Sequence, residues 1–98
     1  MNEVTQEKLD KYFEVTGKAL KKVKIVEKGE VNFKEAGEDF LDMATRYYQD
    51  AKHFQEKGDK VLAFAALNYA HGWLDAGARL GIFDVDGDNV LFTVDPKE

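Results

Sequence analysis

The chain is 98 residues long, has a formal net charge of -5 at pH 7 and contains no cysteine. This length predicts a single domain, residues 1–98, that can bury a core without disulfides or metal. The missing cysteines exclude a thiol nucleophile and a thiolate metal site, and they fit a cytoplasmic protein. The acidic charge disfavours nucleic acid as a partner. No apolar run approaches the roughly 20 residues of a membrane span, so no membrane partner is expected.

The first predicted helix covers about residues 5–28. Thr5 can cap its free amides, and the apolar residues that follow recur at three- and four-residue steps, which is the pattern of one helical face. Gly29 is a natural stop. The members of this face are Leu9, Tyr12, Phe13, Thr16, Leu20 and Val23.

A second helix is predicted over about residues 33–57. Asn32 and Glu35 have the spacing of a capping box, with Asn32 as the cap and Glu35 reaching back. The segment Lys57-Gly58-Asp59 then reads as a short link between antiparallel neighbours, in which Asp59 caps a third helix over residues 60–80.

The third helix carries two apolar stripes. The first stripe has the alternating steps of a bundle seam. The second stripe follows the same rhythm one position along and contains small residues that would admit another backbone. Because a lone three-helix bundle needs only one wide apolar stripe, we expect the second to be covered by the C-terminal tail or by a second subunit. The first stripe is Leu62, Ala66, Tyr69, Trp73, Ala76 and Leu80; the second is Ala63, Leu67, Ala70, Leu74 and Gly77.

The tail, residues 82–98, contains the acidic run Asp84-Val85-Asp86-Gly87-Asp88-Asn89 between two apolar runs. Asp, Gly and Asn between such runs predict a turn in a hairpin or extended tail. The alternative is a calcium loop with Asp84, Asp86 and Asp88 as ligands. That interpretation is weakened by Asp95 at the position of the bidentate glutamate and by Pro96, which prevents an exiting helix. The sequence therefore favours a turn without a metal.

His71, Asp75 and Arg79 lie four residues apart and predict one face of the third helix. An ion-pair ladder along a helix edge is the simpler interpretation. The alternative is a proton-transfer site in which Asp75 orients His71, at a pocket near Trp73 and the helical glycines Gly72 and Gly77. No serine or cysteine accompanies His71, so no nucleophilic triad is predicted.

Arg46 and His53 lie seven residues apart on the second helix, hence on one face. This spacing resembles the Arg-x6-His motif of HEPN ribonucleases, which are also helical bundles. The resemblance implies an RNA-cleaving site at these two residues. The polar residue that often follows the arginine in that family is Tyr47 here, a departure that weakens the match.

A wider resemblance rests on the run Ala66 to Phe83, ALNYAHGWLDAGARLGIF in one-letter code, together with Tyr48 to Phe54, the Lys57-Gly58-Asp59 link and the closing Leu91-Phe92-Thr93-Val94. These segments resemble a small archaeal family, "domain of unknown function 357". The resemblance implies a three-helix up-and-down bundle with a short C-terminal extension, in archaeal cytoplasm, and it brings no established activity.

The sequence thus predicts an all-α fold, a three-helix antiparallel bundle with an extended or hairpin tail. Its predicted function is that of a non-catalytic helical interaction module without a cofactor, a homodimer that also binds another protein. The expected interface is the second stripe of the third helix together with Phe92 of the tail. RNA cleavage at Arg46 and His53, and calcium binding in the tail, are the alternatives.

Overall fold

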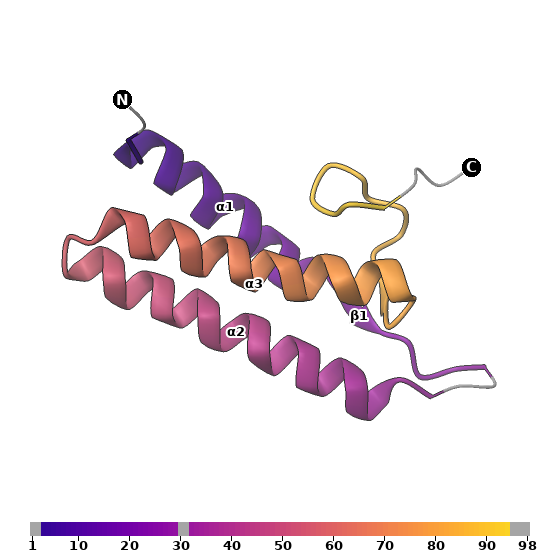
Figure 1. The fold of residues 1–98 in the computed structure, drawn as a ribbon. Coiled ribbons are helices and arrows are strands. Elements are labelled where there is room, and N and C mark those ends of the chain that lie inside the picture. Colours follow the sequence, from indigo (N-terminus) through magenta and orange to yellow (C-terminus); the bar gives the residue numbers. More distant parts are fainter. Residues whose placement is uncertain (1–2, 30–31, 95–98) are drawn as a thin grey trace.

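A computed structural model describes residues 3–29 and 32–94 and confirms the three-helix fold (Figure 1). The helices are α1 (Gln6–Lys22), α2 (Lys34–Glu56) and α3 (Lys60–Leu80), with two short strands, β1 (Lys24–Ile25) and β2 (Phe83–Asp84). α2 and α3 run antiparallel and side by side, whereas α1 and the tail lie along the other side of α3. α3 is therefore the central element of the bundle.

The predicted start of α1 is confirmed, but its end is wrong. The Thr5 hydroxyl accepts a hydrogen bond from the Lys8 amide at 3.1 Å, as an N-cap should. The helix ends at Lys22 rather than near residue 28, because Val23 is extended and the chain continues as β1. β1 pairs antiparallel with β2, with Lys24 opposite Asp84 and Ile25 opposite Phe83. A long-range strand pair thus replaces the last turns of the predicted helix.

The ends of α2 and α3 follow local rules in three of four cases. Asp59 caps α3 by accepting the Leu62 amide at 3.0 Å, and Gly81 ends α3 in the left-handed conformation with φ 81°. Gly58 turns the α2–α3 link with φ 79°. The predicted capping box at Asn32 is wrong, because Asn32 Oδ1 accepts the Lys34 amide at 2.8 Å in a local turn and the N-cap residue of α2 is Phe33.

The acidic run of the tail forms turns. Asp84 Oδ1 accepts the Asp86 amide at 2.9 Å, and Asp88 Oδ1 accepts the Val90 and Leu91 amides at 3.0 Å each. The predicted turn is confirmed. A hairpin between the two flanking apolar runs is not formed in the described part of the tail, since Phe83 and Asp84 pair with β1 instead. Residues 95–98, which include Asp95 and Pro96 of the calcium-loop interpretation, lie outside the described residues.

The second stripe of α3 is the core of the single chain. Ala63, Leu67, Ala70 and Leu74 are 0% exposed, and Gly77 and Phe92 are also buried. One core cluster joins Leu74 to Phe83 and Phe92 of the tail, and the other joins Leu67 to Leu9 of α1. α1, α2 and the tail cover these residues within one chain, so of the two coverings expected for the second stripe, the tail is the one that the structure shows.

Candidate functional site

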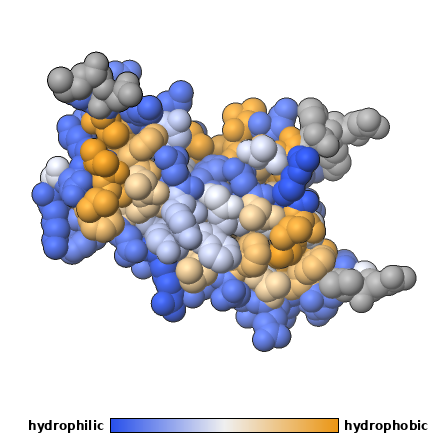
Figure 2. All heavy atoms as spheres, viewed as in Figure 1, coloured by the Kyte–Doolittle hydropathy of each residue, from blue (hydrophilic) through white to orange (hydrophobic). Residues whose placement is uncertain are grey.

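The exposed apolar surface of α3 contains Leu62, Tyr69, Ala76 and Leu80 of the first stripe, with other residues beside them. Four large side chains there are strongly exposed: Val61 (66%), Leu62 (47%), Tyr69 (57%) and Leu80 (66%). Ala65, Gly72 and Ala76 are exposed between them. Figure 2 shows apolar side chains at both ends of this surface and paler aromatic residues between them. We call this surface the outer face; it consists of Val61, Leu62, Ala65, Asn68, Tyr69, Gly72, Ala76 and Leu80.

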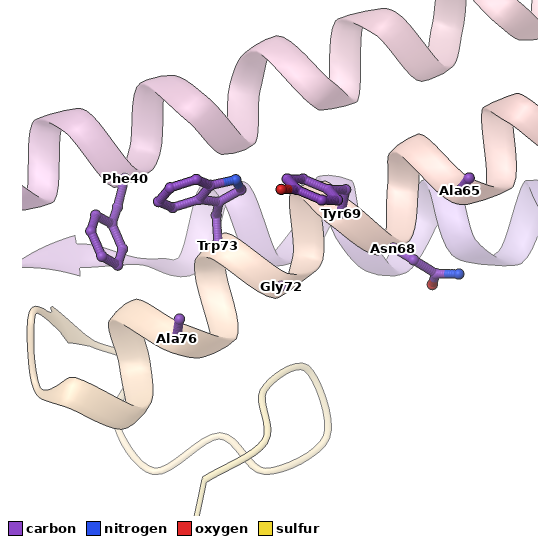
Figure 3. Close-up of a pocket in the computed structure, with 7 residues that line it drawn as sticks. All are labelled: Phe40, Ala65, Asn68, Tyr69, Gly72, Trp73 and Ala76. Atoms are coloured by element: carbon purple, nitrogen blue, oxygen red, sulfur yellow. The ribbon is translucent and has the colours of Figure 1, made fainter.

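An apolar groove of about 680 Å³ lies where the outer face meets α2. Figure 3 shows the rings of Tyr69 and Trp73 projecting from α3 toward α2, with the ring of Phe40 beside Trp73. The Phe40 and Trp73 rings pack edge to face with centroids 5.1 Å apart, and the Tyr69 ring lies 4.4 Å from that of Tyr47 on α2. Such pairs hold aromatic walls in fixed positions. The groove is lined by Phe40, Ala65, Asn68, Tyr69, Gly72, Trp73 and Ala76.

The groove lining is apolar and aromatic, with few polar groups. Its polar groups are the amide of Asn68 and the hydroxyl of Tyr69, and none of the lining residues is a carboxylate, histidine, lysine or arginine. Exposed aromatic side chains in an apolar groove are the usual anchors of protein interfaces. Tyr69, Trp73 and Ala76 were predicted as members of the inner seam, whereas they line this groove.

Gly72 is the glycine of the outer face that packing within the chain does not explain. A Cβ added at Gly37 would lie 2.6 Å from the side chain of Ile25, and one added at Gly17 would lie 2.9 Å from the Tyr48 hydroxyl. A Cβ added at Gly77 would collide with the Phe83 ring. At Gly72 it would meet nothing within 4 Å. Since a glycine inside a helix costs about 1 kcal/mol relative to alanine, Gly72 destabilises α3 without a packing gain inside the described chain.

His71 and Asp75 hold the tail and do not form the predicted ladder with Arg79. His71 Nδ1 lies 3.1 Å from the Thr16 hydroxyl of α1, and Nε2 lies 2.6 Å from the carbonyl oxygen of Leu91. A carbonyl only accepts, so Nε2 donates to it and the other ring nitrogen bonds the hydroxyl. We use the name tail latch for the residues that hold the tail against α1 and α3, which are Thr16, His71, Asp75, Leu91 and Thr93.

Asp75 completes the tail latch. Its two carboxylate oxygens accept from the Thr93 amide at 2.8 Å and from the Thr93 hydroxyl at 3.2 Å. The nearest approach of Asp75 to His71 Nε2 is 3.8 Å, and that nitrogen already donates to Leu91. Arg79 lies exposed at the rim of the pocket that the latch and the tail enclose. Because both His71 nitrogens are engaged, the arrangement supports a structural role.

Loss of a hydrogen bond in the tail latch is expected to destabilise the folded chain. His71→Ala is expected to lower the free energy of unfolding by about 1–3 kcal/mol, because it leaves the Thr16 hydroxyl, which is 1% exposed, and the Leu91 carbonyl without their partner. Urea unfolding of His71→Ala, Thr16→Val and the double variant should show a coupling of about 0.5 kcal/mol or more. Strictly additive losses would contradict the Thr16–His71 bond.

The ribonuclease candidates lie on the exposed surface of α2. Arg46 Nε donates to Asp42 Oδ2 at 2.9 Å, and His53 is exposed, with its ring 6.3 Å from that of Phe54. Arg46 therefore already has a carboxylate partner one turn away. Arg46 and His53 remain a prediction from their spacing.

The calcium candidates do not assemble into a metal site. No group of three or more His, Cys, Asp or Glu side chains that could hold a metal occurs in residues 3–29 and 32–94. The carboxylates of Asp84 and Asp88 accept backbone amides of the turns, so they stabilise the tail.

Elsewhere in the molecule, burial raises the pKa of Tyr48, and a hydrogen bond from Lys18 lowers the pKa of Glu14.

The fold and the groove together define a small helical bundle with one open apolar face. The chain belongs to the DUF357 family, proteins of unknown function, whose family model matches residues 11–83. The matched segment runs from α1 to the first residue of β2 and includes the whole outer face. No curated protein and no solved structure matches the chain. None of the described helices is long and apolar enough to cross a membrane.

Proposed function

We propose that the protein is a non-catalytic, homodimeric helical interaction module, and that its binding site is the groove between α2 and α3. The observation that carries the proposal is the exposed aromatic and apolar lining of this groove, with Tyr69 57% exposed at its centre. The apolar lining runs along α3 and is bordered on the α2 side by Phe40, which suits an amphipathic helix laid along it. The proposed partners are therefore helices, from a second copy or from another protein.

The charge and composition of the chain support a protein partner. A net charge of -5 disfavours the phosphate backbone of nucleic acids. The absence of cysteine supports a cytoplasmic setting. The runner-up function is RNA cleavage at Arg46 and His53, which rests on their spacing along an exposed face of α2.

The experiment that tests the proposal is site-specific photo-crosslinking in the cells that make the protein. A benzophenone amino acid at position 69 is expected to capture one defined protein, either a second copy of the chain or another protein. The matched control places the same amino acid at Val90, which is 88% exposed but lies in the tail. No adduct at position 69, or the same adducts at both positions, would contradict the proposal.

The runner-up has its own measurement. The purified chain is expected to leave RNA intact. Cleavage that His53→Ala abolishes would replace the interaction proposal with the ribonuclease one.

A further inference from the structure

The outer face has a self-complementary arrangement. Its large and small residues are placed symmetrically about the middle of α3, near Ala70 and His71. If two copies of α3 cross antiparallel at this midpoint, Leu62, Tyr69 and Leu80 of one copy lie near equal or small side chains of the other. About the point between Ala70 and His71, Ala65 pairs with Ala76 and Tyr69 with Gly72, and Leu62 comes within one residue of Leu80.

We infer that the groove is occupied by α3 of a second copy, antiparallel to the first, with Tyr69 seated over Gly72 of the partner subunit. This inference rests on the proposed function and names its partner. It gives Gly72 the reason that the single chain lacks, because the space around it within 4 Å is open to an incoming ring. The two-fold axis uses the same surface of both copies, as an isologous dimer requires.

The charges at the two ends of the outer face fit this orientation. α2 is antiparallel to α3, so its acidic first turns, with Glu35 and Asp39, lie beside the end of α3 at Leu80. The opposite end, at the start of α3, carries Lys57 and Lys60 together with Glu56 and Asp59, so its charges cancel and it is less acidic than the end at Leu80. In an antiparallel dimer, Lys60 of the partner subunit comes next to Glu35 and Asp39. A parallel dimer would bring the acidic ends of the two copies together, which repulsion disfavours.

The area of the face sets the expected affinity. α3 has 21 residues and is therefore roughly 30 Å long, and two adjacent helices are about 20 Å wide. A face of about 600 Å² per copy gives an interface of about 1,200 Å² in total, the lower limit for specific complexes. We therefore expect a reversible dimer whose dissociation constant lies in the micromolar range.

Paired single-cysteine variants test the orientation. Because the native chain has no cysteine, Leu62→Cys and Leu80→Cys each introduce a single thiol, at an exposed position of the full chain. An equal mixture of the two variants is expected to form covalent dimers with a short bismaleimide. Each variant alone is expected to stay uncoupled, since its two copies of the thiol lie roughly 27 Å apart along the helices. Mixing Leu62→Cys with Val90→Cys is the negative control.

Sedimentation equilibrium of the cysteine-free chain measures the dimer itself. Tyr69→Ala is expected to raise the dissociation constant at least tenfold, as for a central aromatic anchor. Leu80→Asp is expected to weaken the dimer as well, whereas Val90→Asp, at a more exposed apolar position in the tail, should leave it unchanged.

The outcomes separate this inference from the proposed function. Efficient coupling of Leu62→Cys with itself would show a parallel dimer and overturn the antiparallel register. A chain that stays monomeric at millimolar concentration would overturn the inference altogether. If position 69 then captures a different protein in cells, the interaction function stands with another partner and its homodimeric part falls. If it captures nothing, the inference and the proposed function both fall.

Discussion

Replacing Leu74 by alanine is expected to lower the free energy of unfolding by about 2–5 kcal/mol. Leu74 is 0% exposed and belongs to the cluster that joins α3 to Phe83 and Phe92 of the tail. The loss has two parts, the transfer free energy of the removed methyl groups and the cavity that the fixed surroundings cannot fill. Urea unfolding followed by circular dichroism measures this loss directly.

The matched control is Leu80→Ala on the same helix. Leu80 is 66% exposed, so at protein concentrations where the chain is monomeric its loss should be within about 0.5 kcal/mol. The effect of Leu74→Ala should not depend on protein concentration, because the core that it disrupts lies within one chain. A Leu74→Ala variant that folds normally but associates less would restore the second stripe as an interface.

Local signals in the sequence predicted the helices well. Thr5 and Asp59 cap α1 and α3 as expected, since an N-cap depends only on residues within one turn. Gly58 and Gly81 likewise take the left-handed backbone that ends a helix. These features, with the periodic apolar residues, were enough to predict the three-helix bundle.

Long-range pairing explains the errors. β1 ends α1 early because Ile25 pairs with Phe83, 58 residues further along the chain, and no residue near Ile25 indicates this partner. The same pairing turns the tail back over α3 and buries Leu74 and Gly77 beneath it. Both stripes of α3 are apolar, so hydrophobicity alone could not decide which one faces outward. The packing of α1, α2 and the tail against α3 determines which stripe is buried.

The candidate site shows the same division. The sequence placed His71 and Asp75 on one helical face, which the structure confirms, but their partners come from elements far along the chain. A pocket near Trp73 and Gly72 was predicted, but with His71 and Asp75 beside it, and these two residues bind the tail instead. The detectable signal was Gly72, an unfavourable residue inside a helix at a position that no internal partner requires.

Two glycines of α3 are expected to respond in opposite directions to the same substitution. Gly77→Ala should lower the free energy of unfolding by about 1–3 kcal/mol, because its methyl group collides with the ring of Phe83, which is itself 3% exposed. Gly72→Ala should raise it by about 1 kcal/mol in the monomer, since the methyl group enters open space and alanine favours the helix. Urea unfolding of both variants at low protein concentration measures the two effects.

Comparing the two substitutions distinguishes Gly77, which the fold needs, from Gly72, which it does not. A neutral Gly77→Ala would mean that Phe83 and β2 can shift, and the close approach of α3 to the tail would then lose its significance. At high protein concentration Gly72→Ala should weaken the dimer, because its methyl group would stand between α3 and Tyr69 of the partner subunit. A variant that unfolds less readily yet dimerises less tightly identifies Gly72 as a contact for a second chain. Gain in both properties would assign Gly72 no role in association.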